Sequence, residues 1–267
     1  MIDPRDFLTE YGISPNKALG QNFLTDAGAI ERIVSLAAEP RLPILEIGPG
    51  LGALTFPLAN TGLPLAAVEL DGTLCGILRE KLPENAFVVN SDFLKADLED
   101  IISKLGGGGI SIVGNLPYYI TSPICMRLMT SGVQAQRMTL MMQREAAERF
   151  SACPGDKNYV PLTVLARYLF EVTRVFELSP ASYWPQPDVS STVLLFESRG
   201  KTLPAGLVTL TKCAFAMRRK TLQNNLCAMG LSKAEAASLI EKAGLSPSVR
   251  AEALDVDDFV RLAGLMQ

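Results

Sequence analysis

Short apolar runs alternate with amphipathic stretches over the first 150 residues of the chain. The runs are rich in aliphatic side chains and fall at 44–47, 65–70, 86–89, 110–113 and 138–142. Segments with helical spacing of apolar residues lie around them, at 26–38, 53–60, 73–81, 97–104, 122–131 and 144–151. Because continuously apolar strands are typical of sheets buried on both faces, the alternation predicts a parallel sheet covered by helices. Thr25 or Asp26 is the expected N-cap of the first of these helices.

The pattern changes beyond Arg144. A helix is expected over 159–170, followed by strands over 171–178 and 192–197 that add an antiparallel edge to the sheet. The segment 180–187 between those strands contains three prolines, which argues against both helix and sheet pairing. It also contains Tyr183 and the only tryptophan, Trp184. We expect Tyr183 to be available for binding and Trp184 to pack inward.

Helical patterns fill the remainder of the chain after a linker at 198–201. They cover 207–217, 219–228, 233–243 and 256–266. The sequence therefore predicts two domains. Residues 1–199 form an α/β domain with an N-terminal arm at 1–25, and residues 200–267 form a small all-helical domain.

Histidine is absent from the composition. This excludes a Ser-His-Asp or Cys-His triad, a histidine general base and a histidine-ligated metal. The five cysteines, at 75, 125, 153, 213 and 227, are scattered and odd in number. Neither a disulfide framework nor a zinc pattern fits this spacing, so we expect reduced core residues and no metal site.

The net charge of −3 for the whole chain is unfavourable for nucleic-acid binding. Such binding, however, depends on a local patch of basic side chains and not on the net charge. The densest basic cluster contains Lys212, Arg218, Arg219 and Lys220, in a stretch expected to be helical. On charge alone, a nucleic-acid-binding patch and an ordinary solvated helix face are equally good interpretations. No apolar run approaches the length of a membrane span, and the first twelve residues carry three acids, so we expect a cytoplasmic protein.

A glycine-rich turn follows the first apolar run, with the sequence Glu46-Ile-Gly-Pro-Gly-Leu-Gly-Ala53. Glycines allow the backbone to turn sharply and to approach a ligand closely. Glu69 ends the next strand, 21 positions beyond Gly48, where a carboxylate can accept hydrogen bonds from ribose hydroxyls. Asp92, after the third strand, can accept from an adenine amino group.

The same glycine spacing also fits an NAD-linked dehydrogenase. However, Glu46 would place a negative charge near the pyrophosphate, and no evident hydride-transfer partner accompanies the motif. The carboxylates therefore favour S-adenosylmethionine over a dinucleotide.

Asn115-Leu116-Pro117-Tyr118 follows the apolar run 110–113, with Gly114 expected to bend the chain at the end of that strand. An amide, a carbonyl before proline and an aromatic ring can together hold an exocyclic amino group. Proline fixes φ and has no N–H that would compete for the carbonyls. In isolation such a segment is more often an ordinary tight turn.

Taken together, the motifs resemble those of the ribosomal RNA adenine dimethyltransferase (KsgA/RsmA) family. They occur in the family's order across residues 15–255. The matching segments are Leu19-Gly-Gln-Asn-Phe-Leu24, Glu46–Gly52, Val68-Glu-Leu-Asp71, Gly114–Tyr119, Gln143-Arg-Glu145 and Arg218-Arg-Lys-Thr-Leu222.

The resemblance implies a Rossmann-like class I methyltransferase that uses S-adenosylmethionine and releases S-adenosylhomocysteine. It implies N6-dimethylation of two adjacent adenosines in the 3′-terminal hairpin loop of small-subunit (16S) ribosomal RNA, during biogenesis of the subunit. The cofactor-binding positions carried over are Asn22, Leu24, Gly48, Gly50, Glu69, Asp92 and Asn115. The catalytic positions, which would hold the flipped adenine, are Asn115, Leu116, Tyr118 and Tyr183. Arg218, Arg219 and Lys220 would contact ribosomal RNA, and a monomer suffices.

Two segments depart from the family pattern. Asp188 replaces a basic residue within Pro185–Ser191, and Val160-Pro161-Leu162 replaces a glycine-containing segment. Both changes bear on affinity for RNA and not on the methyl-transfer site.

Three alternatives remain open from the sequence. They are a resistance-type methyltransferase of large-subunit RNA, a non-catalytic assembly or transcription factor, and a small-molecule methyltransferase or dehydrogenase. Leu116 and the segment 143–145 favour the small-subunit reading over the first of these.

Overall fold

The computed structural model describes residues 4–16 and 19–266, which form two compact units. The first unit comprises the described residues up to Ala147 together with Thr173–Ser198. The second comprises Glu148–Val172 and the residues from Arg199 onward. Among the described residues, no helix combines the length and apolar character needed to cross a membrane.

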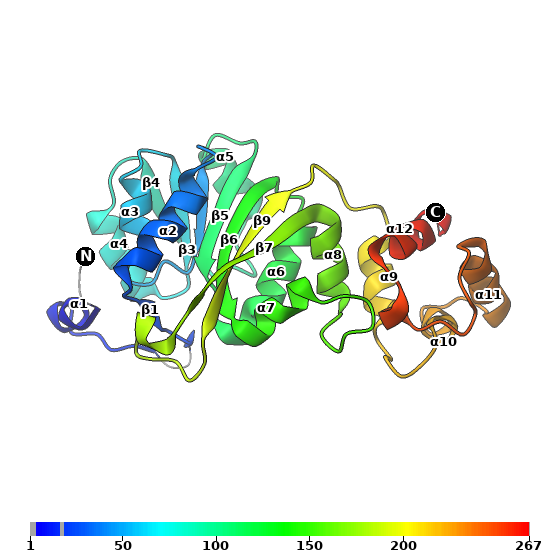
Figure 1. Cartoon of the computed structure of the whole chain (residues 1–267). Coiled ribbons are helices and arrows are strands. Elements are labelled where there is room, and N and C mark those ends of the chain that lie inside the picture. Colours follow the sequence, from blue (N-terminus) through cyan, green and yellow to red (C-terminus); the bar gives the residue numbers. More distant parts are fainter. Residues whose placement is uncertain (1–3, 17–18, 267) are drawn as a thin grey trace. The chain divides into compact units, whose positions relative to one another are not determined.

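The first unit is built on a seven-stranded sheet with the order β4-β3-β2-β5-β6-β9-β7 (Figure 1). Strands β2 to β6 are parallel to their neighbours, and β9 is antiparallel to β6, as the sequence predicts. Chain order reverses between β2 and β5, so a crevice opens at their carboxyl ends. The strand bounds are β2 Ile44–Ile47, β3 Leu65–Glu69, β4 Ala86–Asn90, β5 Ile110–Asn115, β6 Ala135–Gln143, β7 Phe170–Leu178 and β9 Ser191–Ser198.

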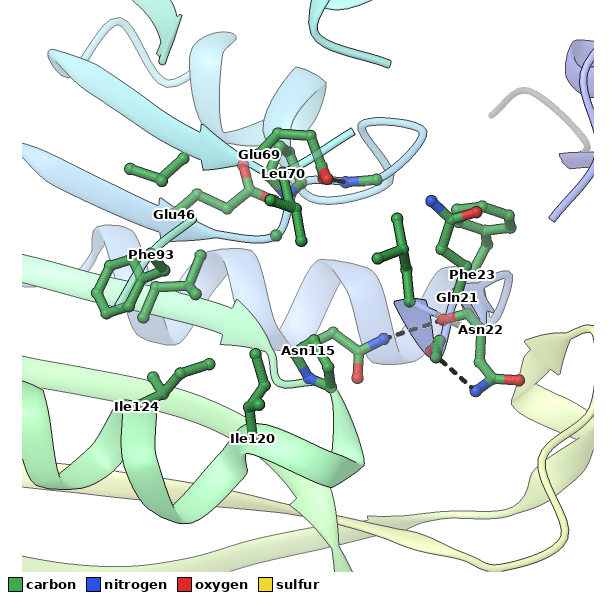
Figure 2. A pocket seen from close by; sticks show the side chains of 18 of the residues that line it. Gln21, Asn22, Phe23, Glu46, Glu69, Leu70, Phe93, Asn115, Ile120 and Ile124 are labelled. Atoms are coloured by element: carbon green, nitrogen blue, oxygen red, sulfur yellow. Dashed lines mark hydrogen bonds between the residues drawn. The ribbon is translucent and has the colours of Figure 1, made fainter. Parts of the chain in front are cut away.

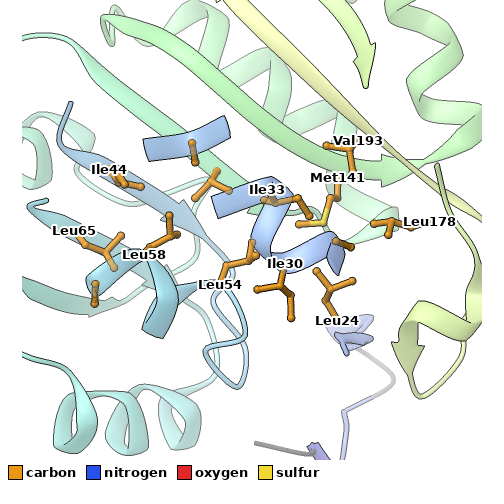
Figure 3. Packing of buried hydrophobic residues seen from close by; sticks show 14 of the residues in the cluster. Leu24, Ile30, Ile33, Ile44, Leu54, Leu58, Leu65, Met141, Leu178 and Val193 are labelled. Atoms are coloured by element: carbon orange, nitrogen blue, oxygen red, sulfur yellow. The ribbon is translucent and has the colours of Figure 1, made fainter. Parts of the chain in front are cut away.

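Helix α1 (Pro4–Glu10) precedes the first strand of the chain. The helices that follow are α2 Ala27–Ala38, α3 Thr55–Ala59, α4 Gly72–Lys81, α5 Leu98–Lys104, α6 Thr121–Thr130 and α7 Arg144–Ser151, of which α7 runs from the first unit into the second. Asp26 is the N-cap of α2, where its carboxylate accepts the Ala29 N–H at 3.0 Å. Ile30 and Ile33, one turn apart, place the apolar face of α2 against Met141 and Leu58 in the main core (Figure 3).

The loop at 180–187 contains more regular structure than the sequence predicts. Residues Pro180–Ser182 form a 3₁₀ turn, and β8 (Tyr183–Trp184) pairs antiparallel with β1 (Phe23–Leu24). Adjacent residues of a strand point to opposite faces. Tyr183 therefore joins Leu24 in the main core, whereas Trp184 packs with Phe23 in a second cluster that includes Phe7. The expectation that Tyr183 is exposed for binding was wrong, because the Tyr183 ring is only 2% exposed.

Gly114 also differs from its predicted role. It lies inside β5, opposite Ile47 of β2, and does not bend the chain at the end of the strand. A Cβ atom at this position would lie 2.8 Å from the Ile47 carbonyl oxygen. Glycine is thus required for the close approach of β2 and β5 beside the crevice.

The second unit is helical, and it includes a segment that the sequence analysis assigned to the α/β domain. Helix α8 (Pro161–Leu169) contacts α9 (Leu207–Ala214) and α12 (Val256–Leu265). The ring of Tyr159 lies 5.8 Å from that of Phe215, which in turn lies 5.7 Å from Phe259. This aromatic packing groups 148–172 with the C-terminal helices, in contrast to the single boundary predicted after residue 199.

The remaining helices of this unit are α10 (Leu222–Ala228) and α11 (Lys233–Lys242). Helix α9 ends at Ala214, three residues earlier than predicted. Asn225 stabilises the turn that follows, since its amide donates to the Ala214 carbonyl at 2.8 Å and accepts the Met217 N–H at 3.1 Å. All five cysteines are free thiols, but only Cys75 and Cys125 are buried, so the expectation of core residues fails for Cys153, which is exposed.

Replacement of Gly114 by alanine is expected to destabilise the protein by about 1–3 kcal/mol, because the new Cβ meets backbone and cannot be relieved by a side-chain rotation. Gly76→Ala is the matched control. Gly76 is exposed within α4 with open space around it, so alanine there is expected to stabilise the protein by roughly 0.5–1 kcal/mol. Urea denaturation of both variants measures the difference, and equal effects would contradict the assigned role of Gly114.

Candidate cofactor and target site

A cavity open to solvent lies at the carboxyl ends of β2, β3, β4 and β5. Ligand sites of this fold class occur at this end of the sheet. All seven residues predicted to bind a cofactor line this cavity, namely Asn22, Leu24, Gly48, Gly50, Glu69, Asp92 and Asn115. Figure 2 shows how Glu46, Glu69 and Asn115 come from different strands to surround the same space.

The glycine-rich turn after β2 forms one wall of the cavity. Gly48 and Gly50 adopt positive φ angles of 66° and 56°, which a side chain would disfavour. A Cβ on Gly50 would also lie 3.2 Å from the Phe23 ring. The turn is held in place by Glu69, whose carboxylate accepts the Gly50 N–H at 3.0 Å.

Glu69 ends β3 and is largely buried. Its second oxygen accepts the Asp71 N–H at 2.9 Å. Burial raises the pKa of Glu69, and these backbone hydrogen bonds oppose that rise by favouring the carboxylate. Each oxygen keeps a further lone pair, so the carboxylate can accept hydrogen bonds from a pair of hydroxyl groups.

Asp92 lies in the turn after β4, where its carboxylate accepts the Leu94 N–H at 2.9 Å. The turn is fixed from α6 by Arg127, which donates to the carbonyls of Leu94 and Ala96. Sequence reasoning missed Arg127, because neither its position along α6 nor its type shows which loop it reaches. Phe93 and Ile124 supply apolar surface beside Asp92 in the cavity.

Glu46 is the most deeply buried acid of the site, with 1% of its surface exposed. Its Oε2 atom has no hydrogen-bond partner among the described residues. Burial raises the pKa of Glu46 to about 8; the Thr55 hydroxyl opposes the rise and the Glu69 carboxylate adds to it.

Asn115 connects the cavity to the N-terminal segment. Its side-chain amide donates to the Asn22 carbonyl at 3.1 Å, and the Asn22 amide donates to the Gly20 carbonyl at 3.2 Å (Figure 2). A carbonyl partner accepts only from the NH₂ end of the amide, which fixes the orientation of Asn115. The Oδ1 atom of Asn115 is therefore the acceptor end of an amide that lines the cavity.

The other three predicted catalytic residues, Leu116, Tyr118 and Tyr183, do not line the cavity. Leu116 is buried, and its N–H donates to the Met141 carbonyl at 2.9 Å. The hydroxyls of Tyr118 and Ser191 are hydrogen-bonded at 3.1 Å, and the buried Tyr183 hydroxyl lies close to the same serine. Burial raises the pKa of both tyrosines. The structure thus places Tyr183 in support of Tyr118.

Tyr119 is a cavity residue that the sequence analysis did not select. Its side chain is 56% exposed and packs beside Gly20 at the cavity wall. Its position next to Tyr118 in the motif is the only signal by which the sequence could have identified it.

The predicted RNA-binding residues lie in the turn between α9 and α10, and not within a helix as expected. They also differ in their contacts. Arg218 donates to the Lys157 carbonyl at 2.7 Å and pairs with Glu252 at 3.4 Å. Arg219 and Lys220 are exposed beside it. Arg218, although itself exposed, therefore has partners within the second unit, and Arg219 and Lys220 are exposed cations beside it.

The chemistry of the cavity fits a cationic nucleoside. Three carboxylates line it, from Glu46, Glu69 and Asp92, and none of the described lining residues is lysine or arginine. A pyrophosphate would meet uncompensated negative charge there, which argues against a dinucleotide. Across the described ranges, no group of three histidine, cysteine or acidic side chains gathers that could hold a metal ion.

Comparison with known proteins places the chain in a family. The model of the ribosomal RNA adenine dimethylase family matches residues 13–267. The chain is 39% identical to the ribosomal RNA small subunit methyltransferase A of Desulfitobacterium hafniense, over 93% of this chain and 91% of that protein. It is 38% identical to the protein of the same name from Streptococcus sanguinis, over 98% and 96% of the two chains.

Solved structures share the fold. A dimethyladenosine transferase from Plasmodium falciparum superposes with a TM-score of 0.71 at 24% identity, covering 90% of this chain and 95% of that one. The 23S rRNA methyltransferase ErmE superposes with a TM-score of 0.64 at 28% identity, over 91% and 99% of the chains. With this architecture and the family match over nearly its whole length, the chain belongs to the ribosomal RNA adenine dimethylase family.

Proposed function

We propose that this protein transfers methyl groups from S-adenosylmethionine to N6 of two adjacent adenosines in the 3′-terminal hairpin loop of 16S ribosomal RNA. It would act as a monomer in the cytoplasm, on the assembling small subunit, and release S-adenosylhomocysteine. The observation that carries the proposal is the orientation of Asn115, whose Oδ1 acceptor lies at the edge of an acidic, glycine-walled cavity. The family membership supports the substrate class.

S-adenosylmethionine, when bound, supplies an electrophilic methyl group on a positively charged sulfur. The residues that would hold it are those that line the cavity. Glu69 offers acceptors for the ribose hydroxyls, and Asp92 offers an acceptor for the adenine amino group. The open glycine turn lets the backbone approach the amino-acid portion without a side chain in the way.

The target nitrogen requires alignment because its lone pair is delocalised into the adenine ring. Hydrogen bonds from N6 to the Asn115 Oδ1 and the Leu116 carbonyl favour a pyramidal nitrogen whose lone pair faces the methyl group. The neighbouring Pro117 carbonyl is used within the turn, where it accepts from the Ile120 N–H at 3.2 Å and the Thr121 hydroxyl at 3.0 Å. The proton can leave to water after transfer, so a histidine base is not needed.

Stacking would come from Tyr118, whose ring is anchored through its hydroxyl to Ser191. Extrusion of a base from its stack costs a few kcal/mol, and stacking on an aromatic ring offsets about 1–3 kcal/mol per base. The burial of Tyr183 removes it as a second stacking surface in this conformation. Its hydroxyl lies close to Ser191, which is the hydrogen-bond partner of Tyr118.

A related activity on large-subunit RNA is the second candidate, because a 23S rRNA methyltransferase has a similar structure at 28% identity. The deciding experiment incubates the protein with labelled S-adenosylmethionine and unmethylated small or large subunits, and then maps the modified bases. Dimethyladenosine at the adjacent pair near the small-subunit 3′ end is the expected result. Label in the large subunit alone would select the second candidate, and label in neither would contradict both.

Asn115→Ala is expected to lower kcat by about 10²–10³, because it removes an acceptor that aligns the target nitrogen. Binding of S-adenosylmethionine should weaken but stay measurable, since the contact to Asn22 is also lost. Single-turnover methylation and calorimetric binding separate the two effects. Asn224→Ala, an exposed substitution in α10, is the control and should behave as wild type. Near-normal turnover in the Asn115 variant would contradict the alignment mechanism.

Replacement of Arg219 and Lys220 together by alanine is expected to weaken RNA binding and to reduce the slope of log K against log salt by about 1.5. The reason is that each phosphate contact that is lost lowers by about one the number of counterions released when the RNA binds. Lys233→Ala/Lys242→Ala, which removes equal charge from exposed positions on α11, is the control. An unchanged salt slope in the first variant would show that this turn does not contact RNA.

Arg218→Ala should behave differently from the pair beside it. Loss of its contacts to Lys157 and Glu252 is expected to lower the thermal stability of the second unit as well as RNA affinity.

A further inference from the structure

Glu46 differs from the other acids of the cavity in that part of its carboxyl group is unsatisfied. Both oxygens of Glu69 accept backbone N–H groups, and Asp92 accepts one as well. The Oε2 atom of Glu46 has no partner in the described part of the chain, and the residue is 1% exposed at the cavity wall. A negative charge on a carboxyl buried in this way is costly.

The surroundings of Glu46 add no positive charge. The titratable groups that share the cavity are the carboxyls of Glu69 of β3 and Asp92 after β4 and the phenol of Tyr119. Helix α3 presents the Thr55 hydroxyl and β5 presents the neutral Asn115 amide. Burial, with the Glu69 carboxylate nearby, accordingly raises the pKa of Glu46 to about 8, so the group carries a proton at neutral pH while no cation is present.

The proposed cofactor and its product differ by one positive charge in this cavity. The donor carries a sulfonium, whereas the product carries a neutral thioether in its place. A cation brought within several ångströms of a buried carboxyl favours the ionised form, because Coulomb attraction is strong where water is excluded. The thioether provides no such attraction. The same carboxyl should therefore respond oppositely to the two ligands.

We propose that Glu46 responds to the charge on the cofactor sulfur, losing its proton when the sulfonium form binds and keeping it when the thioether form binds. The proton passes from the carboxyl oxygen to a buffer base, and the resulting carboxylate pairs with the cation. After methyl transfer has removed the charge from sulfur, the carboxylate takes up a proton from solvent. Glu46 is thus a specificity-determining residue that favours donor over product. The inference rests on the proposed use of S-adenosylmethionine.

The sign of the pH dependence follows from proton release. Binding of the donor releases a proton from Glu46, so donor affinity rises with pH up to about 8 and then levels off. The affinity for the product does not change with pH on account of Glu46, because Glu46 keeps its proton when the product binds. The ratio of donor to product affinity should therefore rise about tenfold between pH 6 and pH 7. Because both ligands carry the same amino group, its titration changes both affinities equally and cancels in their ratio.

Isothermal titration calorimetry in two buffers of different ionisation enthalpy tests the proposal on the full chain. At pH 7, S-adenosylmethionine should release about one proton more than S-adenosylhomocysteine. In the Glu46→Gln variant this difference in proton release should vanish, and the ratio of donor to product affinity should become independent of pH. S-adenosylhomocysteine should still bind to the variant, and this binding also shows that the variant is folded. Glu99→Gln, an exposed change on α5, should match wild type.

Equal proton release by both ligands in the wild type, or a difference that persists in Glu46→Gln, would overturn the proposal. If the variant fails to fold, the wild-type affinity ratio decides alone, since a ratio that is flat between pH 6 and pH 9 is incompatible with this role. Failure of the wild type to bind either ligand would instead count against the proposed function.

Discussion

The close contact between β2 and β5 is the constraint on which the rest of the site depends. Chain order reverses between these strands, so the segments that follow them lead to opposite sides of the sheet and leave a crevice at the strand ends. Gly114 lies opposite Ile47, and the absence of a Cβ allows the strands to approach each other there. One residue further on, Asn115 ends β5 beside the glycine turn that follows β2. A wider spacing would separate the Asn115 amide from the cavity.

Charge sets the second constraint, because a cavity with three carboxylates and no lysine or arginine among its described lining residues selects for positive charge. The acids are not equivalent. Glu69 is stabilised as a carboxylate by two backbone N–H groups, one of which fixes the glycine turn. Glu46, by contrast, has one oxygen without a hydrogen-bond partner in the described part of the chain. The two acids therefore differ in their environments, although both lie near the carboxyl ends of neighbouring parallel strands.

The cavity walls are held in place by contacts between residues that are far apart in the sequence. The N-terminal segment is fixed by pairing between β1 and β8 and by the hydrogen bond from Asn115 to Asn22. The turn that carries Asp92 is fixed by Arg127, which reaches it from α6. Each wall of the cavity therefore depends on a different element.

The sequence by itself determined the alternation of strands and helices and the parallel sheet with its antiparallel addition, and it selected seven of the residues that line the cavity. These succeed because apolar periodicity, caps such as Asp26 and glycine spacing are local signals. Only the tertiary structure decided the burial of Tyr183, which follows from a two-residue pairing with Phe23–Leu24 across a separation that no local pattern reveals. It likewise decided the role of Arg218 and the grouping of 148–172 with the C-terminal helices. The physical reason is that burial and pairing depend on which distant surfaces meet, whereas propensity and spacing depend on neighbours along the chain.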